Sequence, residues 1–514
     1  MVPGSCRPVL ALERLLSHHG SLDTSRSVAR LRHHGVEKIR PGLGSQVTRR
    51  SIALSSTHMH KTKMSPAEVT KRLKANEFTK KDLPKRPKCS VKSFDINTLE
   101  SNQPVEDSTA QAILPNGAML FGVFDGHGGA ACGQVVARRI FEYIAAALLS
   151  SEKLSNHLKD INASVEKDDK TNPDPLVEDY NCKFEVVDEL KKIYYKSYRD
   201  FLDTLSQKHM ANENIFSEPN VEHILIDSFL RLDDDMSNEA MKDRKDNNIQ
   251  TVTVAMSGCV AAVAYIDGID LHVASTGDCT AVVGYLNETD TWMPQRLTIE
   301  HNSDNVNEVK RIKSEHPENE HHNLIQGGRL LSQLAPLRAF GDYKFKWDIP
   351  NIQKILGSIG WESACPPNYK TPPYLTARPE VQYHRLTPRD KFLVIASDGL
   401  WDILTPMQVV RLVGEHIKGK SVLEPFELND DEEHKLQDIL KQLKRRQIAE
   451  KVRPVDPNAA THLIRNALGN TAFGMDHQKI SQSLSLPQNK VRMFRDDITI
   501  QVVFFNDDYL RKHR

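Results

Sequence analysis

The sequence predicts an α+β fold in which antiparallel sheets are covered by helices. Strand-like segments occur in runs, and long amphipathic helices occur in pairs, without the strict β-α alternation of a doubly wound parallel sheet. Short acidic motifs also recur far apart on the chain, and most of them end a strand-like run. They are VED (105–107), FDGHGG (124–129), SDGLWD (397–402) and RDD (495–497).

Length and composition indicate an ordinary globular protein. The chain has 514 residues, of which 39% are apolar and 26% charged, which suits one large catalytic domain with tails or two to three average domains. The longest apolar candidate, residues 140–150, is short and contains Glu142. We therefore expect no membrane span, and we expect no nucleic acid among the partners.

The first 63 residues differ in charge from the rest of the chain. They contain eleven Arg or Lys and three acidic residues, while the whole chain has a net charge of zero. The segment is also rich in Ser and begins with a short amphipathic stretch, a pattern typical of an organelle transit peptide. A disordered basic tail is the alternative.

The seven cysteines indicate a reducing compartment. They are odd in number, widely spread and free of C-x-x-C pairs, which argues against a disulfide scaffold and against a zinc site.

Periodicity predicts the elements in chain order. After a loosely ordered connection at 64–92, the folded part begins near Ser93. A buried strand, GAMLFGVFD, leads into a helix at about 128–150, and residues 151–186 are expected to be a loop. The later helices are predicted at 187–208, 219–242, 404–417 and 457–468, with an exposed helix in an insertion at 431–452.

The remaining strands are predicted from apolar runs bounded by Gly, Asp or Asn. The runs SGCVAAVAYI, DLHVAST and TAVVGYL follow one another as in an antiparallel meander. The other predicted strands are 380–386, 391–397 and 497–506.

The motif FDGHGG is suited to metal-dependent hydrolysis. A buried strand delivers Asp125 to the edge of a sheet, and Gly126 is expected to let the backbone turn sharply, so that its carbonyl faces the same ion. His127 could protonate a leaving alkoxide, because imidazole titrates near neutrality. A tight turn with an exposed histidine is the alternative for this motif taken alone.

Two other motifs place carboxylates at strand ends in the same way. Asp398 follows the apolar strand KFLVIA, where Trp401 is expected to pack and fix the turn, and Asp496 and Asp497 precede the last strand. These carboxylates can converge only if their strands are neighbours. Such a set suits two hard cations, Mg²⁺ or Mn²⁺, which activate water and neutralise a phosphoryl group together.

The order of the motifs resembles the protein phosphatase 2C family of metal-dependent Ser/Thr phosphatases. The family pattern runs ED, DGHGG, GD before a strand, R-A-x-G-D, DGxWD and a terminal D-[ND]-x-[ST], and this chain follows it from about 100 to 506. The resemblance implies an αββα sandwich of two antiparallel sheets flanked by helices, with a binuclear metal site at one edge.

The resemblance also implies roles for individual residues. Asp125 would bridge two Mg²⁺ or Mn²⁺ ions, with the Gly126 carbonyl on one of them and Asp398 and Asp496 on the other. Glu106, Asp107, Asp278 and Asp497 would act in an outer shell or on a third, weaker ion. His127 would be the general acid, and a metal-bridging water would attack phosphoserine without a covalent phosphoenzyme.

Longer stretches resemble the subgroup of this family that acts on the pyruvate dehydrogenase complex. They are residues 338–347, 371–402, 456–470 and 486–503. The subgroup implies a mitochondrial matrix enzyme that reactivates the complex by dephosphorylating the alpha subunit of its decarboxylase component. Three features stay open: binding to the lipoyl domain of the acyltransferase core, a regulatory subunit, and Ca²⁺ at a partner interface.

Three positions depart from the usual family pattern. Asn102 stands where many members carry a phosphate-binding Arg, a substitution that the subgroup shares, so we expect Asn102 to contact the substrate. Val260 and Thr280 replace a Thr and an Arg.

The expected domain organisation is a transit peptide at 1–63, a linker at 64–92 and a phosphatase domain at 93–508 with insertions near 151–186 and 419–456.

Two alternative functions are a general Ser/Thr phosphatase of the same family and a pseudophosphatase scaffold. The scaffold would be favoured by loss of a metal-binding carboxylate, and all of them are present.

Overall fold

The computed structural model describes residues 64–81, 83, 89–166, 176–179, 190–211, 220–241, 249–357, 365–426 and 435–513. The chain divides into two units, Met1–Lys63 and Met64–Arg514. The predicted transit peptide lies outside the described residues, and every described helix and strand belongs to the second unit.

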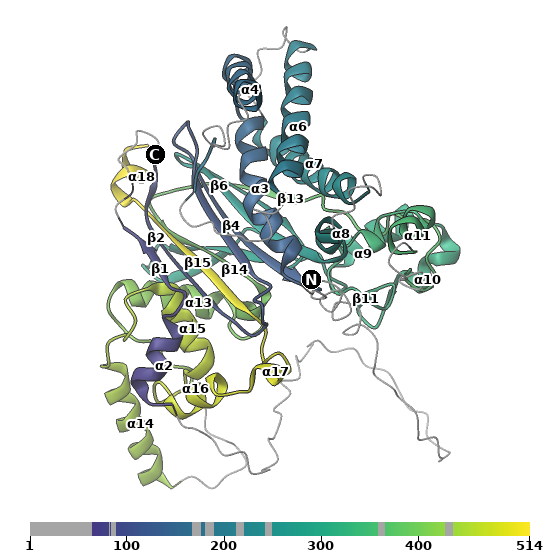
Figure 1. The fold of residues 1–514 in the computed structure, drawn as a ribbon. Helices are drawn as coiled ribbons and strands as arrows, with labels where there is room; N and C mark the ends of the chain where they lie inside the picture. The colour runs from purple at the N-terminus through teal and green to yellow at the C-terminus, as the bar shows by residue number, and fades with distance from the viewer. Residues whose placement is uncertain are drawn as a thin grey trace, which may run out of the picture. The chain divides into compact units, whose positions relative to one another are not determined.

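Two antiparallel sheets form the centre of this unit (Figure 1). The first has the order β1-β2-β15-β14-β8-β9, with β1 Phe78–Lys80, β2 Val91–Leu99, β15 Ile498–Phe505, β14 Asp390–Ala396, β8 Thr280–Leu286 and β9 Trp292–Arg296. The second has the order β13-β7-β6-β4-β3-β5, with β13 Glu380–Arg385, β7 Asp270–Thr276, β6 Gly258–Asp267, β4 Met119–His127, β3 Ser108–Ile113 and β5 Glu178–Asp179. A short strand, β12 (Phe340–Gly341), pairs with β6.

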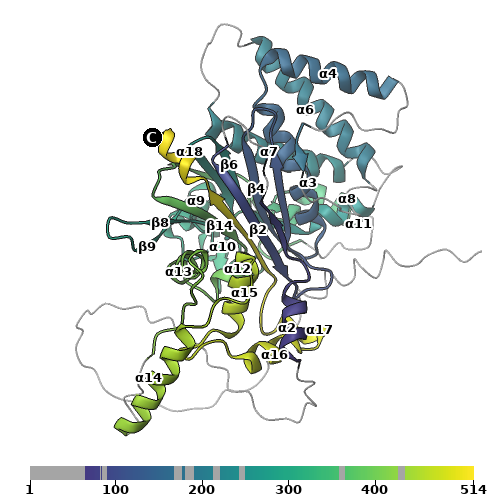
Figure 2. The same cartoon turned by 90° about the vertical axis from the view of Figure 1, so that its left-hand side faces the viewer.

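Helices cover the outer face of each sheet, which confirms the predicted αββα architecture (Figures 1 and 2). On the second sheet lie α3 (Ala131–Ala147), α7 (Val221–Met241) and α8 (Ile249–Met256), with α4 (Ser151–Glu166) and α6 (Lys191–Ala211) packed on one another and beside them. On the first sheet lie α13 (Pro406–Ile417) and α15 (Ala459–Gly469), with α16 (His477–Leu484) packed on α15.

The remaining elements are short or peripheral. They are β10 (Ile325–Gln326) paired with β11 (Arg329–Leu330), α9 (Val306–Glu315), η2 (Glu318–Glu320), α10 (His321–Leu324), η3 (Tyr343–Phe345), α11 (Ile349–Gly357), α12 (Asp398–Trp401), α14 (Leu436–Glu450), α17 (Gln488–Val491) and α18 (Asp507–Lys512). No helix among the described residues is long and apolar enough to span a bilayer.

The central strands are apolar on both faces because each sheet lies between helices and the other sheet. Residues 258–266 of β6 are all buried, as are 392–396 of β14. Phe94 of β2 and Phe121 of β4 meet edge to face across the two sheets, with ring centroids 5.2 Å apart. This burial explains why these strands read as continuous apolar runs rather than as alternating ones.

Two predictions about local structure were wrong. Residues 151–166 form α4 instead of a loop, and the segment 64–92 contains α2 (Pro66–Leu73) and β1. Helix α2 begins with a capping box between Ser65 and Glu68, and it packs against α15 and α16. Its Val69 and Leu73 are buried. The surrounding sequence is rich in lysine, so the composition of the segment did not reveal the apolar face of the helix. The folded unit therefore begins about thirty residues before Ser93.

Candidate active site

The predicted carboxylates come from strands that are neighbours, as the sequence analysis required. β14 ends two residues before Asp398, and β15 begins two residues after Asp496; the two strands pair antiparallel, with Ala396 opposite Ile500. Asp125 lies near the end of β4, in the facing sheet, opposite Val260 of β6. Asp278 follows β7 in the turn to β8.

Burial and mutual repulsion raise the pKa values of these carboxylates. Burial, followed by the charges of Asp107, Asp398, Asp278 and Asp496, raises the pKa of Asp125 well above its ordinary value. Burial, then the charges of Asp278 and Asp496, raises the pKa of Asp398 to about 8. Such shifts are expected where like charges share a site of low polarity.

Asp107 and Asp278 belong to the same cluster. Burial, with the charge of Asp497, raises the pKa of Asp107 to about 7. Burial also raises the pKa of Asp278 to about 6, against the opposing effect of His127. All four groups therefore resist ionisation unless positive charge is brought to the site.

The donor set fits hard divalent cations. The Asp398 Oδ1 atom is buried without a hydrogen-bond partner among the described residues, as expected of an oxygen reserved for a ligand. Carboxylate oxygens are the ligands that Mg²⁺ and Mn²⁺ prefer. The described residues contain no group of three or more His, Cys, Asp or Glu side chains already close enough to hold an ion. The individual ligand assignments thus stay predictions.

Glu106 and Asp107 have distinct hydrogen-bond partners. Asp107 Oδ2 accepts a hydrogen bond from Ser397 Oγ at 2.8 Å, which ties it to the residue before Asp398. Glu106 Oε1 accepts from the Gly129 backbone N–H at 2.7 Å, and Oε2 pairs with Arg492. Both side chains thereby connect the loop before β3 to other parts of the site.

Asp497 organises the loop at 101–106. Its Oδ1 accepts backbone N–H groups of Ser101 and Asn102 at 2.5 and 2.9 Å. Its Oδ2 accepts the Asn102 side-chain amide and the Glu106 N–H, both at 2.9 Å. A carboxylate with four N–H donors is already satisfied. This pattern supports a role for Asp497 in holding the loop, and it shows that the Asn102 side chain serves as one of the donors to Asp497.

Gly126 and Gly399, the glycines of the two Asp-Gly pairs, each have the backbone of another segment packed directly against them. A Cβ at Gly126 would stand 2.4 Å from the Glu106 carbonyl oxygen, and one at Gly399 would stand 2.0 Å from that of Asp497. The expected sharp turn at Gly126 was wrong: β4 continues to His127, and positive φ angles of 67° and 122° occur at Gly128 and Gly129. Close packing, not a turn, is the reason for glycine at position 126.

His127 is held by an aspartate to which the sequence analysis gave no role. Its Nε2 lies 2.5 Å from Asp342 Oδ2. A Cβ at Gly258, opposite His127 in the sheet, would stand 2.1 Å from the same nitrogen. Burial lowers the pKa of His127, but the Asp342 charge and hydrogen bond outweigh it, so the pKa is raised. Asp342 therefore makes the imidazole hold its proton more strongly than an isolated histidine would.

Asp342 is itself positioned by helix α7. Asp233 of α7 accepts a hydrogen bond from the Gly341 backbone N–H at 3.0 Å. Its two carboxylate oxygens also accept hydrogen bonds from Lys346 Nζ, at 2.8 and 2.7 Å. Asp342 has a φ of 50°, an uncommon backbone for a non-glycine residue. The acidic stretch LDDDMSNE (232–239) lies inside α7, where Asp233 fixes the loop that presents Asp342.

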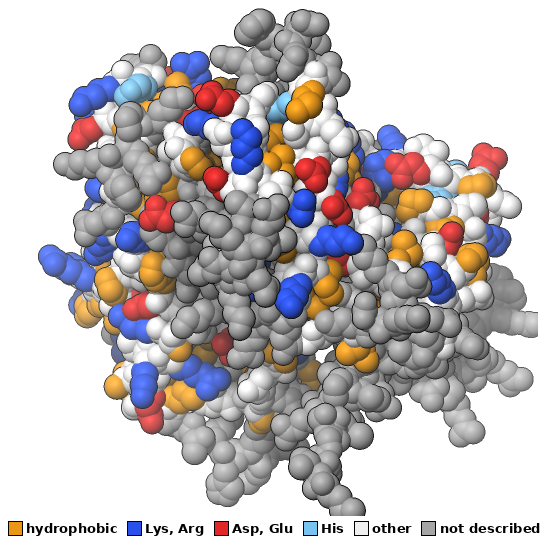
Figure 3. Space-filling view, turned by 45° about the horizontal axis from the view of Figure 1, so that its top comes forward, with side chains coloured by type: hydrophobic (Ala, Val, Ile, Leu, Met, Phe, Trp, Pro, Cys, Tyr) orange, Lys and Arg blue, Asp and Glu red, His pale blue; other side chains and the backbone are white. Residues whose placement is uncertain are grey.

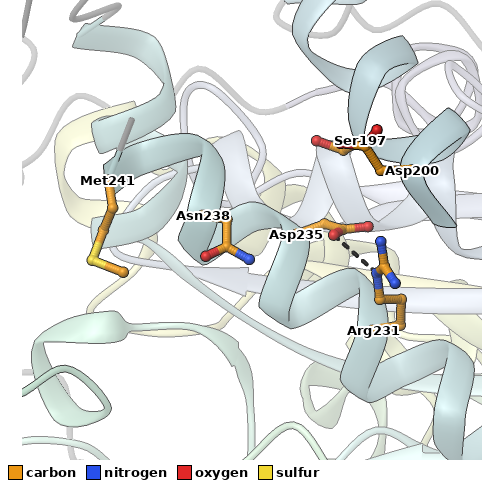
Figure 4. Close-up of a pocket in the computed structure, with 6 residues that line it drawn as sticks. All are labelled: Ser197, Asp200, Arg231, Asp235, Asn238 and Met241. Atoms are coloured by element: carbon orange, nitrogen blue, oxygen red, sulfur yellow. Dashed lines mark hydrogen bonds and ion pairs between the residues drawn. The ribbon is translucent and has the colours of Figure 1, made fainter. Parts of the chain in front are cut away.

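A separate hollow of about 410 Å³ lies between α6 and α7 (Figure 4). It is lined by Ser197, Asp200, Arg231, Asp235, Asn238 and Met241. Arg231 and Asp235, one turn apart on α7, form an ion pair at 3.0 Å on its wall. None of the predicted site residues lines this hollow. On the face seen in Figure 3, acidic and basic side chains are intermixed over the described part.

The fold and the acidic site agree with one known family. The family model described as Protein phosphatase 2C matches residues 178–454, a little over half of the chain. The chain belongs to the protein phosphatase 2C family, and it is a protein phosphatase, of a family that depends on Mg²⁺ or Mn²⁺.

Its relatives narrow the comparison. The chain is 42% identical over 466 residues to pyruvate dehydrogenase (acetyl-transferring) phosphatase 1, mitochondrial, of Bos taurus, covering 86% of this chain and 83% of that protein. It is 39% identical to phosphatase 2 of the same name from Homo sapiens, covering 87% and 84%. The Saccharomyces cerevisiae phosphatase 1 is 28% identical, covering 80% and 68%.

The sequence did not predict two charged contacts at the site. Asp342 stands in the segment RAFGD (338–342), which matches the family motif R-A-x-G-D, but nothing in that pattern indicates His127 as its partner. Arg492 stands four residues before Asp496, and both lie in the connection between α17 and β15, where Arg492 Nη1 is 3.3 Å from Asp496 Oδ1. Two of the three departures from the family pattern are buried. Val260 lies opposite Asp125 in the sheet, and Thr280 Oγ1 accepts a hydrogen bond from Arg296 at 3.0 Å.

Proposed function

We propose that this protein is the mitochondrial matrix phosphatase that removes phosphate from serine in the alpha subunit of the pyruvate dehydrogenase decarboxylase component, and so reactivates the complex. The observation that carries the proposal is the cluster of buried carboxylates with raised pKa values at the sheet edge. The similarity to phosphatases of that name, which extends over most of both chains, supports the choice of substrate.

The residues assigned to two divalent ions are Asp125, the Gly126 carbonyl, Asp398 and Asp496, with Glu106, Asp107 and Asp278 around them. When bound, such ions lower the pKa of water and neutralise phosphoryl charge. The chain's own contribution is to bury the carboxylates without partners, as at Asp398 Oδ1, and to keep their strands in register.

His127 delivers the proton that the leaving serine oxygen needs. With both ring nitrogens protonated, the Nε2 proton is directed to Asp342, which leaves the Nδ1 proton for the alkoxide. A serine alkoxide is strongly basic, so its departure depends on this proton.

Substrate preference is expected to come from outside the acidic cluster. Asn102 is neutral, and its amide is engaged with Asp497, so a small phosphopeptide gains little charge attraction from it. Docking on a large assembly would raise the local concentration of the phosphoserine. A lipoyl-domain contact, a regulatory subunit and Ca²⁺ at such a contact are compatible with this arrangement.

The test is a phosphatase assay of the purified chain from residue 64 on phosphorylated pyruvate dehydrogenase complex and on a generic phosphopeptide, with Mg²⁺, Mn²⁺ or EDTA. We expect activity with either metal, none with EDTA, and a much higher kcat/KM on the complex. Equal kcat/KM values on both substrates would favour a general phosphatase instead. Binding to the complex without turnover would favour a scaffold.

A further inference from the structure

Arg492 is a permanent cation placed directly against the acidic cluster. Its Nη1 lies 2.9 Å from Glu106 Oε2 and 3.3 Å from Asp496 Oδ1. The Arg492 side chain is 51% exposed, whereas those of Glu106 and Asp496 are 16% and 38% exposed. The guanidinium is therefore more exposed than either carboxylate, and it faces the solvent from which a substrate arrives.

The segment that carries Arg492 is anchored on both sides of it. Before it, Gln488 Nε2 donates to the Ser101 carbonyl at 3.1 Å. After it, Arg495 donates to Ser101 Oγ at 2.5 Å and to the Glu100 carbonyl at 2.7 Å. α17 and the turn after it are thus fixed to the loop at 100–102, so Arg492 is held beside the site rather than left on a free strand of chain.

The guanidinium retains donors for an incoming ligand. An arginine has five N–H groups in a planar fork, and both contacts described for Arg492 use Nη1. Among the described residues, neither its Nε nor its Nη2 has a hydrogen-bond partner. A planar fork with free donors matches two oxygens of a phosphoryl group, which is the usual reason for arginine at phosphate sites.

Arg495 is another permanent cation close to Asp496, but its guanidinium donates to Ser101 Oγ and to the Glu100 carbonyl. His127 and Arg492 are the cations that act most strongly on Glu106, and His127 is committed to Asp342. Lys344 is close to Asp342, but its side chain is buried. A phosphoserine that approaches the cluster carries close to two negative charges, and Arg492 is the fixed charge that can oppose the repulsion from the carboxylates.

We propose that Arg492 is the residue that binds the phosphoryl oxygens of the substrate at this site. The inference rests on the proposed phosphatase function and identifies its phosphate-binding group. Arg492 keeps its position through Glu106 and uses its free donors on the phosphoryl group, while the neutral Asn102 stays on Asp497. The consequence is that phosphate recognition comes from the segment before β15 instead of from the loop before β3.

The experiment compares Arg492→Ala, Arg492→Lys and Lys490→Ala. Lys490 is an exposed cation two residues away with no described ion pair, so its removal changes the net charge equally. KM and kcat are measured on a phosphoserine peptide and on p-nitrophenyl phosphate at saturating Mg²⁺, together with the inhibition constant of inorganic phosphate. Melting temperatures report on folding.

We expect Arg492→Ala to raise KM and the phosphate inhibition constant by about 10- to 100-fold, the usual effect of losing hydrogen bonds to a charged group. Arg492→Lys should recover part of the loss, because it keeps the charge without the fork, and Lys490→Ala should match the wild type. Asn102→Arg in the Arg492→Ala background should also restore phosphate inhibition, since it returns a cation to the same oxygens.

Two results would overturn the inference. One is an Arg492→Ala enzyme with the KM and phosphate inhibition of Lys490→Ala. The other is a loss that disappears when the Mg²⁺ concentration is raised, because Arg492 would then act only on the metal site through Asp496. If the wild type itself has no phosphatase activity, the proposed function fails instead, and that outcome is distinguishable from both.

Discussion

At the scale of single residues, the site stores electrostatic repulsion. Asp107, Asp125, Asp278 and Asp398 are brought together with raised pKa values, although each would ionise readily in an unfolded chain. Folding therefore holds these groups in an arrangement that they resist, and bound cations relieve that cost. Residues selected for a ligand rather than for stability are expected to behave in this way.

Asp398→Asn should separate the role of this carboxylate in metal binding from the repulsion that it adds to the metal-free protein. We expect turnover to fall by more than about 100-fold, because loss of an outer-shell partner of a metal ligand alone typically costs 10- to 100-fold. The metal-free variant should melt at a higher temperature than the metal-free wild type at neutral pH, and thermal unfolding in EDTA measures this.

The pH dependence of this gain in stability follows from the raised pKa of Asp398. The pKa of Asp398 rises from 3.8 to about 8 in the native state, so between these values the native state keeps a proton that the unfolded chain has lost. The wild type thus loses stability as pH rises through this window, and the advantage of Asn should be small near pH 4 and largest above pH 8. Asp438→Asn, on an exposed position of α14, is the control. A variant with wild-type turnover at saturating Mg²⁺ would refute the ligand assignment.

Asp342 is a positioning residue for His127, and its effect should depend on the leaving group. Asp342→Asn keeps a hydrogen-bond partner but removes the charge that raises the pKa of His127. The alkaline limb of the kcat profile on phosphoserine should therefore move to lower pH, while p-nitrophenyl phosphate, whose leaving group needs little protonation, should be nearly unaffected.

His127→Ala sets the upper limit of the same effect, since general acids contribute about 10²- to 10⁴-fold. If Asp342→Asn or His127→Ala slows both substrates equally, the role of that residue is structural. Kinetics on the two substrates across pH 5 to 9 make the comparison.

At the scale of elements, periodicity predicted helices better than composition did. α7, α13 and α15 match the predicted ranges within a few residues because each has an apolar face against a sheet. α4 was missed because its polar, charged residues resemble a loop. α14, predicted as an exposed helix, has no buried residue, and it is held by Arg446, which donates to the carbonyls of Glu424 and Ala472.

The exposed leucines of α14 should matter for the large substrate and not for folding. Leu440 and Leu443 are 51% and 40% exposed, and Lys441, Lys444 and Arg445 lie beside them on the same helix. The double variant Leu440→Ser, Leu443→Ser should leave the melting temperature and the p-nitrophenyl phosphate rate unchanged, and should lower kcat/KM on the intact pyruvate dehydrogenase complex several-fold.

Ile417→Ser is the matched control, since Ile417 is 51% exposed at the end of α13. A double variant with the wild-type kcat/KM on the complex would exclude α14 as a docking element.

At the scale of the whole molecule, the proposed catalytic residues and the predicted transit peptide occupy different parts of the chain. Residues 1–63 carry eleven basic and three acidic residues, and every residue of the proposed site lies beyond them. A fluorescent reporter fused to residues 1–63 should therefore enter mitochondria and be shortened there. Microscopy and blotting provide the measurement. A cytosolic reporter of full length would remove the support for a matrix location and favour the general phosphatase.

The sequence by itself determined the architecture and the family, and it predicted the acidic residues that we propose for the site. Runs of apolar residues ending in Asp-Gly predict strand ends, and their order along the chain allowed Asp125, Asp398 and Asp496 to be named together. This information is local, since each motif contains its own strand and turn.

Only the tertiary structure decided which groups complete the site. His127 and Asp342 are 215 residues apart, and Glu106 and Arg492 are 386 apart. It also showed that Gly126 and Gly399 are glycines because a neighbouring backbone lies against them, and that Asp497 holds a loop. Contacts of this kind depend on the register between strands and on how a distant loop packs over a sheet edge. Neither quantity is written in the spacing of residues along the chain.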